Sequence, residues 1–186
     1  RHSVSKLSHI HLVANELAKS RLIQMGEYTN SIHIIGSPDL DLMKPNNLPL
    51  INDVKKYYDI NFDNYAIGIL HPVTTENSET FTNASIFVDA MIESDLNYIL
   101  IYPNNDIGSS DILINYEKLE KYKNIKIFPS LRFESFLSLL KNSDFIIGNS
   151  STGIREAPYY NIPTINIGTR QNKRSSGELI KNISFN

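Results

Sequence analysis

The sequence predicts an α/β fold, a Rossmann-like parallel sheet with flanking helices. Two observations lead to this prediction: short apolar runs rich in Ile and Val recur along the chain, and helix-sized segments separate them. Parallel neighbouring strands need a crossover between them, so this alternation is typical of βαβ units. The sequence therefore predicts one layered α/β domain.

The N-terminal part of the chain predicts a short strand and a helix before the main alternation begins. A strand-like turn around HIHLVAN is followed by apolar residues at helix-compatible spacing up to Gly26. The run SIHIIGSP then closes with Gly36, Ser37 and Pro38, which is typical of a strand that enters a loop. The Pro- and Asn-rich segment KPNNLPLIND predicts a loop and a candidate domain joint.

The main alternation begins after this segment. Its apolar runs are YAIGIL, NYILIYP, IKIF, DFIIGN and PTINIG. The predicted helices between them span residues 77–93, 111–122, 133–141 and 152–159. Each helix would connect two parallel strands of one sheet.

The composition of the chain excludes some classes of partner and site. At 186 residues, with 41% hydrophobic residues and a formal net charge of -2, the chain is long enough for one well-buried domain. The near-neutral charge argues against a nucleic-acid partner, so any phosphate site must be built from a few residues. The chain has no cysteine and its five histidines lack metal-binding spacing, so no metal is expected.

Location and completeness are also predicted from the sequence. No apolar run is long enough to span a membrane and no signal peptide is recognisable, which predicts a cytoplasmic protein without a membrane partner. The chain begins at Arg1, inside an amphipathic pattern, and not at Met. We therefore expect it to be a fragment.

Polar residues follow the predicted strands. Ligands of parallel α/β sheets bind beyond the carboxyl ends of the strands, so these residues are the candidates for a site. They are His71, Thr74, Thr75, Asn104, Asn105, Phe128, Pro129, Asn149, Ser150, Ser151 and Arg170.

Ser150 and Ser151 stand between the end of a strand at Gly148 and a helix predicted to open by Thr152. Unpaired N–H groups, the positive end of the helix dipole and hydroxyl groups together make a phosphate cradle. An ordinary helix cap uses the same residue types, and it is the commoner case.

Glu156 lies near the opening of the same helix. Its carboxylate could accept both hydroxyl protons of a ribose diol, and compensation of the helix dipole is the alternative role. Arg155, about 100° away around the helix, is expected to form an internal ion pair.

Arg170 and His71 each follow a strand. The guanidinium of Arg170 suits a diphosphate, although a surface arginine beside Lys173 and Arg174 is as plausible from spacing. His71 can donate to a phosphate oxygen or assist a leaving group, and a hydrogen-bonded loop histidine is the alternative. The remaining histidines are interpreted as structural: His2, His9, His11 and His33.

Several stretches resemble the hydrolysing UDP-N-acetylglucosamine 2-epimerases, which open the pathways to sialic, legionaminic and related acids. They are RHSVSKLSHIHLV, GSPDLD, LHPVTTE, YPNNDIGS and, above all, GNSSTGIREAPYYNIPTINIGTRQ. The resemblance covers nearly the whole chain. It implies a glycosyltransferase-B arrangement of two facing Rossmann-like domains. Residues 1–30 would then end the N-terminal domain and its connecting segment, and residues 31–186 would form the C-terminal nucleotide-binding domain.

The resemblance also implies a site and a reaction. His71 would be the catalytic group, and the nucleotide-binding residues would be Asn104, Phe128, Ser150, Ser151, Glu156 and Arg170, with Phe128 contacting the base through its backbone. The C2 proton and the nucleotide would leave, and water would then add to give N-acetylmannosamine. No cofactor is needed. The expected partners are a nucleotide sugar, the missing N-terminal domain with its catalytic carboxylates, and further copies of the protein in a homo-oligomer.

The chain departs from the family's sequence pattern at two positions, and several alternative functions remain. Lys173 and Asn161 stand where the family usually has Gly, which affects loop geometry more than the reaction. A non-hydrolysing 2-epimerase is the first alternative, although HPVTTE replaces its usual HRREN. A glycosyltransferase of the same architecture, and a nucleotide-binding module without activity of its own, are the others. The base, uridine or guanosine, stays open.

Overall fold

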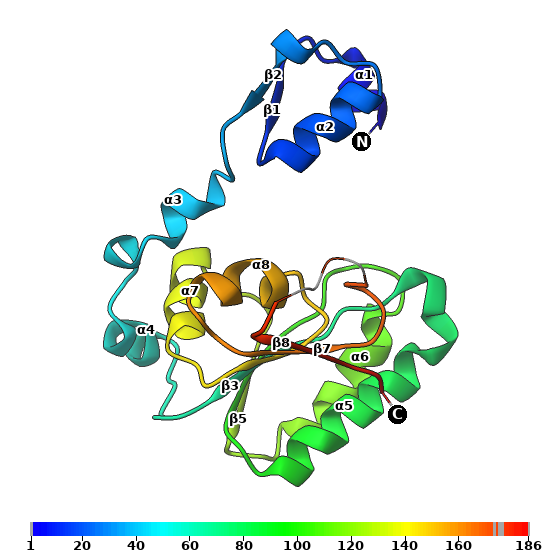
Figure 1. Cartoon of the computed structure of the whole chain (residues 1–186). Helices are drawn as coiled ribbons and strands as arrows, with labels where there is room; N and C mark the ends of the chain where they lie inside the picture. The colour runs from blue at the N-terminus through cyan, green and yellow to red at the C-terminus, as the bar shows by residue number, and fades with distance from the viewer. Residues whose placement is uncertain (1, 173, 175–176, 186) are drawn as a thin grey trace. The chain divides into compact units, whose positions relative to one another are not determined.

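The computed structural model describes residues 2–172, 174 and 177–185 of the chain. The chain divides into two compact units, Arg1–Asn47 and Leu48–Asn186 (Figure 1). The division falls within the Pro- and Asn-rich segment that the sequence indicates as a candidate domain joint. The assignment of residues 1–30 to the end of a preceding domain stays a prediction.

The first unit contains a small parallel strand pair. Strand β1 (His11–Val13) pairs with β2 (Ile32–Ile34), and helix α2 (Glu16–Gln24) connects them. Helix α2 begins as the sequence favours, because the Asn15 side chain accepts the Ala18 N–H at 2.9 Å. The remaining elements of this unit are α1 (His2–Leu7), the 3-10 turns η1 (Thr29–Ser31) and η2 (Pro45–Asn47), and α3 (Asp39–Met43).

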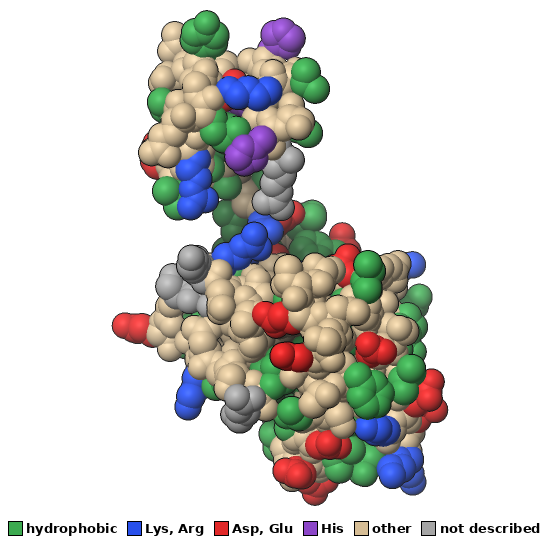
Figure 2. Space-filling model, turned by 90° about the vertical axis from the view of Figure 1, so that its right-hand side faces the viewer, with side chains coloured by type: hydrophobic (Ala, Val, Ile, Leu, Met, Phe, Trp, Pro, Cys, Tyr) green, Lys and Arg blue, Asp and Glu red, His purple; other side chains and the backbone are tan. Residues whose placement is uncertain are grey.

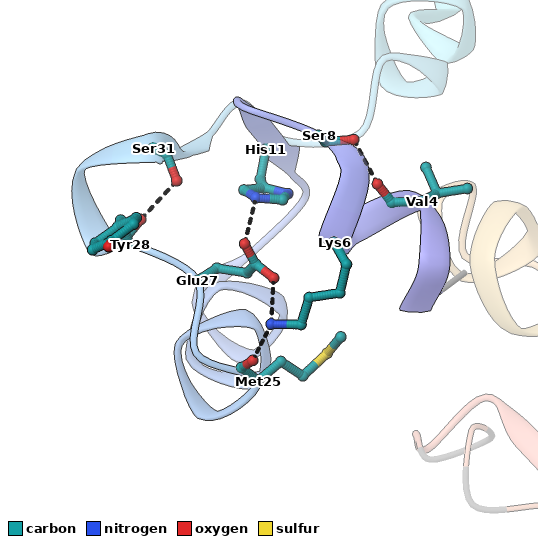
Figure 3. Close-up of polar contacts among 8 residues, drawn as sticks. All are labelled: Val4, Lys6, Ser8, His11, Met25, Glu27, Tyr28 and Ser31. Carbon is teal, nitrogen blue, oxygen red and sulfur yellow. Dashed lines mark hydrogen bonds and ion pairs between the residues drawn. The ribbon is translucent and has the colours of Figure 1, made fainter.

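A cluster of polar contacts joins α1, β1 and the segment after α2 in the first unit (Figure 3). Nε2 of the nearly buried His11 lies 3.2 Å from one Glu27 carboxylate oxygen, and Nζ of Lys6 lies 2.9 Å from the other. Lys6 also donates to the carbonyl of Met25. The hydrogen bond from Lys6 is the main reason that the pKa of Glu27 is lowered. His11 thus has the structural environment that the sequence analysis expects.

The first unit leaves many apolar side chains uncovered, and Figure 2 shows several of them at its surface. Leu7 is 83% exposed and Tyr28 is 85% exposed. Other exposed apolar residues of this unit are Val4, Ile10, Leu12, Leu17, Ile23, Ile34, Ile35, Leu40 and Leu42. So much exposed apolar surface in a small unit is typical of an interaction surface.

The second unit is built on a parallel sheet. Among the described residues the sheet has six strands, in the order β5-β4-β3-β6-β7-β8. They are β3 (Ala66–Ile69), β4 (Tyr98–Ile101), β5 (Ile125–Phe128), β6 (Ile146–Gly148), β7 (Thr164–Ile167) and β8 (Ile180–Ile183). The chain runs outward from β3 to β5, returns to pair β6 with β3, and continues outward to β8.

Helices cover both faces of this sheet (Figure 1). Helices α5 (Thr80–Ser94) and α6 (Ser109–Tyr116) lie on one face, and α7 (Phe133–Lys141) and α8 (Thr152–Tyr159) lie on the other. Helix α4 (Ile51–Tyr57) packs against α7. Strand residues such as Ile67, Ile99 and Leu100 are fully buried, which explains their nearly uninterrupted apolar runs.

The structure confirms the main alternation and corrects the sequence analysis at three places. The segment predicted as a loop contains η2 and the start of α4, because Val54 is buried and α4 packs on α7. Helix α5 starts at Thr80, after a 3-10 segment, η3 (Thr74–Glu79), and α6 ends early in the 3-10 turn η4 (Glu117–Leu119). Strand β8 was not expected.

Among the described residues, no helix is long and apolar enough to cross a membrane.

Candidate functional site

The candidate site lies where the strand order reverses. Strand β3 sits between β4, which follows it in the chain, and β6, which returns to its other side. In open parallel sheets, a crevice forms at this switch point beyond the carboxyl ends of the strands, and ligands bind there. His71 follows β3 and Asn149 follows β6, so both residues stand at the switch point.

His71 is held in one neutral form. Its Nδ1 accepts the backbone N–H of Asn104 at 3.0 Å, so Nε2 carries the proton of the neutral ring. Burial, and then the charge of Arg170, lower the pKa of His71 to about 4, while Asp106 acts in the opposite direction. At neutral pH His71 is therefore a hydrogen-bond donor without charge.

Asn149 connects His71 to the end of β7. Its side chain accepts the His71 N–H at 2.7 Å and donates to the His71 carbonyl at 2.8 Å. Its own carbonyl accepts Nη1 of Arg170 at 3.2 Å and Nε2 of Gln171 at 3.0 Å. The guanidinium of Arg170 is thereby brought to the same end of the sheet as the imidazole of His71.

Ser150, Ser151 and Thr152 form the entrance to α8. The Ser150 hydroxyl accepts the Thr152 N–H at 3.3 Å, and Ser151 occupies the N-cap position. Both capping and phosphate binding use the start of a helix. Here the Gly153 N–H donates to the Ser150 carbonyl at 3.2 Å and the Ile154 N–H donates to the Ser151 carbonyl at 3.1 Å, so a bound phosphate would replace these turn hydrogen bonds. The helix can approach β7 closely only because residue 153 is Gly: a Cβ there would lie 2.6 Å from Cγ2 of Thr164.

Glu156 is nearly buried, with 9% of its surface exposed, on the inward face of α8. The pKa of Tyr160 is raised to about 12, first by burial, then by Tyr159 and by Glu156. Glu156 is therefore a nearly buried carboxylate, and its role in ribose binding or in compensation of the helix dipole stays a prediction. Its neighbour Arg155 is an exposed residue, and the ion pair expected for it stays a prediction.

Two pockets adjoin His71 and Arg170. The first, which we call the apolar pocket, has a volume of about 290 Å³ and is lined by Ile69, His71, Ile101, Tyr102, Pro129, Ser130, Leu131, Phe133, Phe136, Ser150 and Thr152. The second, the polar pocket, has a volume of about 510 Å³ and is lined by Pro72, Val73, Thr74, Thr75, Glu76, Asp106, Thr169 and Arg170. An apolar pocket with a few convergent polar groups at its rim is the usual form of a small-molecule site.

Asn104 adds a further indication of a ligand. Its amide nitrogen donates to Asp106, and its backbone N–H holds His71. Within the part of the chain that the structure describes, its buried Oδ1 has no hydrogen-bond partner. Buried acceptors are almost always satisfied, so this atom is suited to accept a hydrogen bond from a bound molecule.

The structure brings most of the candidate residues together. His71 and Ser150 line the apolar pocket, Arg170, Thr74 and Thr75 line the polar pocket, and Asn104 contacts His71. The aromatic ring of Phe128 packs edge to face on Tyr58 with ring centroids 5.5 Å apart, and its carbonyl accepts the Tyr102 N–H. The apolar pocket begins one residue after Phe128, at Pro129.

Of the two positions that depart from the family pattern, the structure describes Asn161 but not Lys173. Asn161 adopts a left-handed backbone conformation with φ of 58°, which Gly adopts freely and Asn tolerates better than most residues. The expected geometry is therefore preserved there. Lys173 lies outside the described residues. Among the described residues, no group of three or more His, Asp or Glu side chains could hold a metal ion.

The sequence analysis missed several residues of the site. The bridging role of Asn149 and the burial of Gln171 have no sequence signature, because they depend on side-chain contacts with distant backbone atoms. Tyr102, Leu131 and Phe133 could have been found, since they flank the ends of β4 and β5.

Comparison with known sequences identifies one family. The family model described as UDP-N-acetylglucosamine 2-epimerase matches residues 1–184. A UDP-N-acetylglucosamine 2-epimerase of Neisseria meningitidis serogroup B is 54% identical over 187 residues, which cover 100% of this chain and 49% of that protein. A hydrolyzing UDP-N,N'-diacetylbacillosamine 2-epimerase of Legionella pneumophila is 33% identical over 98% of this chain and 49% of that protein. The chain thus spans about half the length of these relatives.

Solved structures share the fold. The UDP-GlcNAc 2-epimerase of Methanocaldococcus jannaschii, in complex with UDP-GlcNAc and UDP, superposes with a TM-score of 0.70 at 21% identity. The match covers 97% of this chain and 52% of that one. The S. aureus MnaA–UDP co-structure gives a TM-score of 0.66 at 20% identity, over 90% of this chain and 46% of that one. The predicted α/β fold is confirmed, and it corresponds to one half of these structures.

Proposed function

The chain belongs to the UDP-N-acetylglucosamine 2-epimerase family, and from this we propose that it is the nucleotide-sugar-binding part of a hydrolysing 2-epimerase. The observation that carries the proposal is the convergence of His71 and Arg170 through Asn149 at the switch point of the sheet, beside the N-terminus of α8. Neutral and cationic donors at one point suit a diphosphate.

The ligand would occupy the site in three parts. The diphosphate would lie against Ser150, Ser151, His71 and Arg170. The base would enter the apolar pocket, whose aromatic and aliphatic lining suits a planar base. Glu156 is not among the residues that line this pocket, so the ribose would lie outside it, where the Glu156 carboxylate would accept hydrogen bonds from the ribose hydroxyls.

Phe128 is the least supported of the proposed contacts. Its carbonyl already accepts a hydrogen bond from Tyr102, and the pocket is lined from Pro129 onward. A backbone contact to the base is therefore better supplied by the segment from Pro129 to Leu131.

The reaction proposed for the complete protein is an elimination followed by hydration. A base removes the C2 proton of the sugar, and the C1–O bond to the nucleotide breaks, which gives a 2-acetamidoglucal and UDP. Water then adds to C1 and a proton returns to C2 from the opposite face, which gives N-acetylmannosamine. The departing diphosphate gains negative charge, which the Nε2–H of His71 and the guanidinium of Arg170 would stabilise.

The base for the C2 proton is proposed to lie in another domain of the protein. The exposed apolar side chains of the first unit support such a domain, because they form a surface that a further segment could cover (Figure 2). We also propose that residues 1–30 are the end of that domain and that residues 31–186 form the nucleotide-binding domain. An oligomer of identical copies is part of the proposal.

A non-hydrolysing epimerase is the alternative reaction. Two observations favour hydrolysis: the relatives from Legionella pneumophila and Campylobacter jejuni are named hydrolyzing, and this chain has HPVTTE after β3. The Campylobacter protein is named as acting on GDP- or UDP-linked N,N'-diacetylbacillosamine, so a guanosine nucleotide or a diacetamido sugar is the substrate alternative.

The test is to incubate the complete protein with UDP-N-acetylglucosamine and, separately, with GDP-N-acetylglucosamine in D₂O. The hydrolysing reaction would release nucleoside diphosphate and yield free N-acetylmannosamine with deuterium at C2, both visible by NMR. Formation of UDP-N-acetylmannosamine with the nucleotide retained would assign the non-hydrolysing reaction. Binding of UDP without conversion of either sugar nucleotide would leave only a nucleotide-binding module.

A further inference from the structure

We propose that Asn149 is the positioning residue of this site, whose amide side chain fixes His71 and Arg170 relative to each other without contacting the ligand. The identity of the ligand rests on the proposed function. The positioning role itself rests on the hydrogen bonds around Asn149.

Asn149 extends the pairing of β3 and β6 beyond the end of the strands. The last ladder pair joins Ile69 to Gly148, and the Asn149 N–H donates to the Ile69 carbonyl at 3.1 Å. At Gly148 the backbone turns with φ of 131°, and a Cβ there would lie 2.0 Å from the Ile69 carbonyl oxygen. Beyond this turn, the Asn149 side chain takes over from the backbone and makes both hydrogen bonds to His71.

All the polar groups of Asn149 are occupied within the protein. Its N–H bonds Ile69, its amide bonds the N–H and the carbonyl of His71, and its carbonyl receives Arg170 and Gln171. Only 2% of its surface is exposed. Asn149 is therefore too buried to bind a phosphate, and it must act through its neighbours.

The side chain must be an asparagine for this arrangement. An amide has one acceptor and one donor side by side, which matches the N–H and the carbonyl of a single residue. Aspartate would place a carboxylate oxygen against the His71 carbonyl, and alanine would leave both groups without a partner. The two bonds fix the backbone of His71, and the Asn104 N–H then fixes its ring.

The experiment compares Asn149→Ala with wild type in the complete protein, by UDP affinity and by ¹⁵N NMR of histidine side chains. The resonance of His71 is assigned from its loss in His71→Gln. Wild type should have the single neutral tautomer with the proton on Nε2. In Asn149→Ala we expect both tautomers, and a dissociation constant for UDP that is roughly 10–100-fold larger, since small displacements of polar groups are costly at such sites.

Asn115→Ala is the matched control. Asn115 is also fully buried, and its amide donates to the carbonyls of Asp111 and Phe81 between α5 and α6. Its substitution should lower stability but leave both the UDP affinity and the His71 tautomer as in wild type. Where Asn149→Ala does not fold, Asn149→Ser takes its place, because it removes the amide without burying a charge beside the His71 carbonyl.

The outcomes separate the two proposals. An altered tautomer in the Asn149 variant of a protein that does not bind UDP would refute the proposed ligand but support the positioning role. Wild-type UDP affinity and an unchanged tautomer in Asn149→Ala would overturn the role. It would also be overturned if both Asn149 variants failed to fold while Asn115→Ala folded, because Asn149 would then be a residue of the fold.

Discussion

At the scale of single residues, the sequence predicts which residues follow the strands, but it does not predict the hydrogen bonds between those residues. The sequence places His71, Ser150 and Arg170 after apolar runs, and the topology of a parallel sheet brings such residues to one edge. The sequence cannot indicate that Asn149 bonds both sides of the His71 peptide, because any strand-end asparagine could cap a helix or a turn instead.

The neutral state of His71 gives a pH prediction. Its pKa is about 4 in the folded protein and near 6.5 when the residue is exposed. The folded state therefore binds fewer protons than the unfolded state below pH 6.5. Stability should fall as the pH is lowered from 6.5 to 4, and this group should contribute no further loss below pH 4. An NMR titration of His71 in the ligand-free protein should have its midpoint near 4, and a midpoint near 6.5 would contradict the buried, neutral form.

Arg170→Ala should weaken binding of the nucleoside diphosphate. Charge-assisted hydrogen bonds to a diphosphate contribute about 1.5–3 kcal/mol, so the dissociation constant for UDP should rise roughly 10- to 150-fold. Isothermal titration calorimetry on the complete protein measures it. Lys141→Ala, at the exposed end of α7, is the control for the loss of one positive charge. An unchanged affinity in Arg170→Ala would mean that Arg170 does not bind the diphosphate and that its hydrogen bond to the Asn149 carbonyl is structural.

Glu156→Gln separates ribose binding from a role in the fold. The substitution keeps size and helix propensity but replaces one acceptor by a donor, so one ribose hydroxyl would lose its partner. UDP affinity should fall, and the preference for UDP over 2′-deoxy-UDP should largely disappear. If the variant discriminated against the deoxy nucleotide as well as wild type does, the ribose would be bound by another residue.

At the scale of elements, strong apolar periodicity was sufficient to predict helices and strands, and weak periodicity was not. The bounds of α7 and α8 agree with the prediction, and the apolar side chains of these two helices are more clearly gathered on one face than those of α5 and α6. Strand β8 was missed because two polar residues, Lys181 and Asn182, separate Ile180 from Ile183 and break the two-residue period of a strand. Its pairing with β7 makes it a strand. Helix α4 was missed because the prolines before it predict a loop, whereas its packing on α7 determines the outcome.

The packing of α8 on β7 gives a stability prediction. In Gly153→Ala the new methyl group would meet Cγ2 of Thr164 at 2.6 Å. Overpacking costs about 1–3 kcal/mol and exceeds the gain in helix propensity of up to about 1 kcal/mol, so the free energy of unfolding should decrease. Adding Thr164→Ser should restore part of it, since Ser lacks the methyl group and keeps the hydroxyl that donates to the Gly153 carbonyl at 2.7 Å. Additive effects in urea denaturation would contradict this contact.

At the scale of the whole molecule, the proposed division of labour between domains predicts the behaviour of the chain by itself. The 186-residue chain should bind UDP but should not release nucleotide from UDP-N-acetylglucosamine, because removal of the C2 proton needs a base that it is proposed to lack. A coupled assay for free UDP measures this. Turnover by the chain alone, above a matched sample of the Arg170→Ala variant, would locate the base among these residues.

The parallel strand order also determines where the molecule can be labelled. All strands of the second unit run the same way, so the connections that enter them lie at the edge opposite the site. Leu96, in the turn between α5 and β4, is 47% exposed at that edge. The chain contains no cysteine, so Leu96→Cys would give it a single thiol for a fluorophore. A dye there would report on the protein from a position that leaves the candidate site unobstructed.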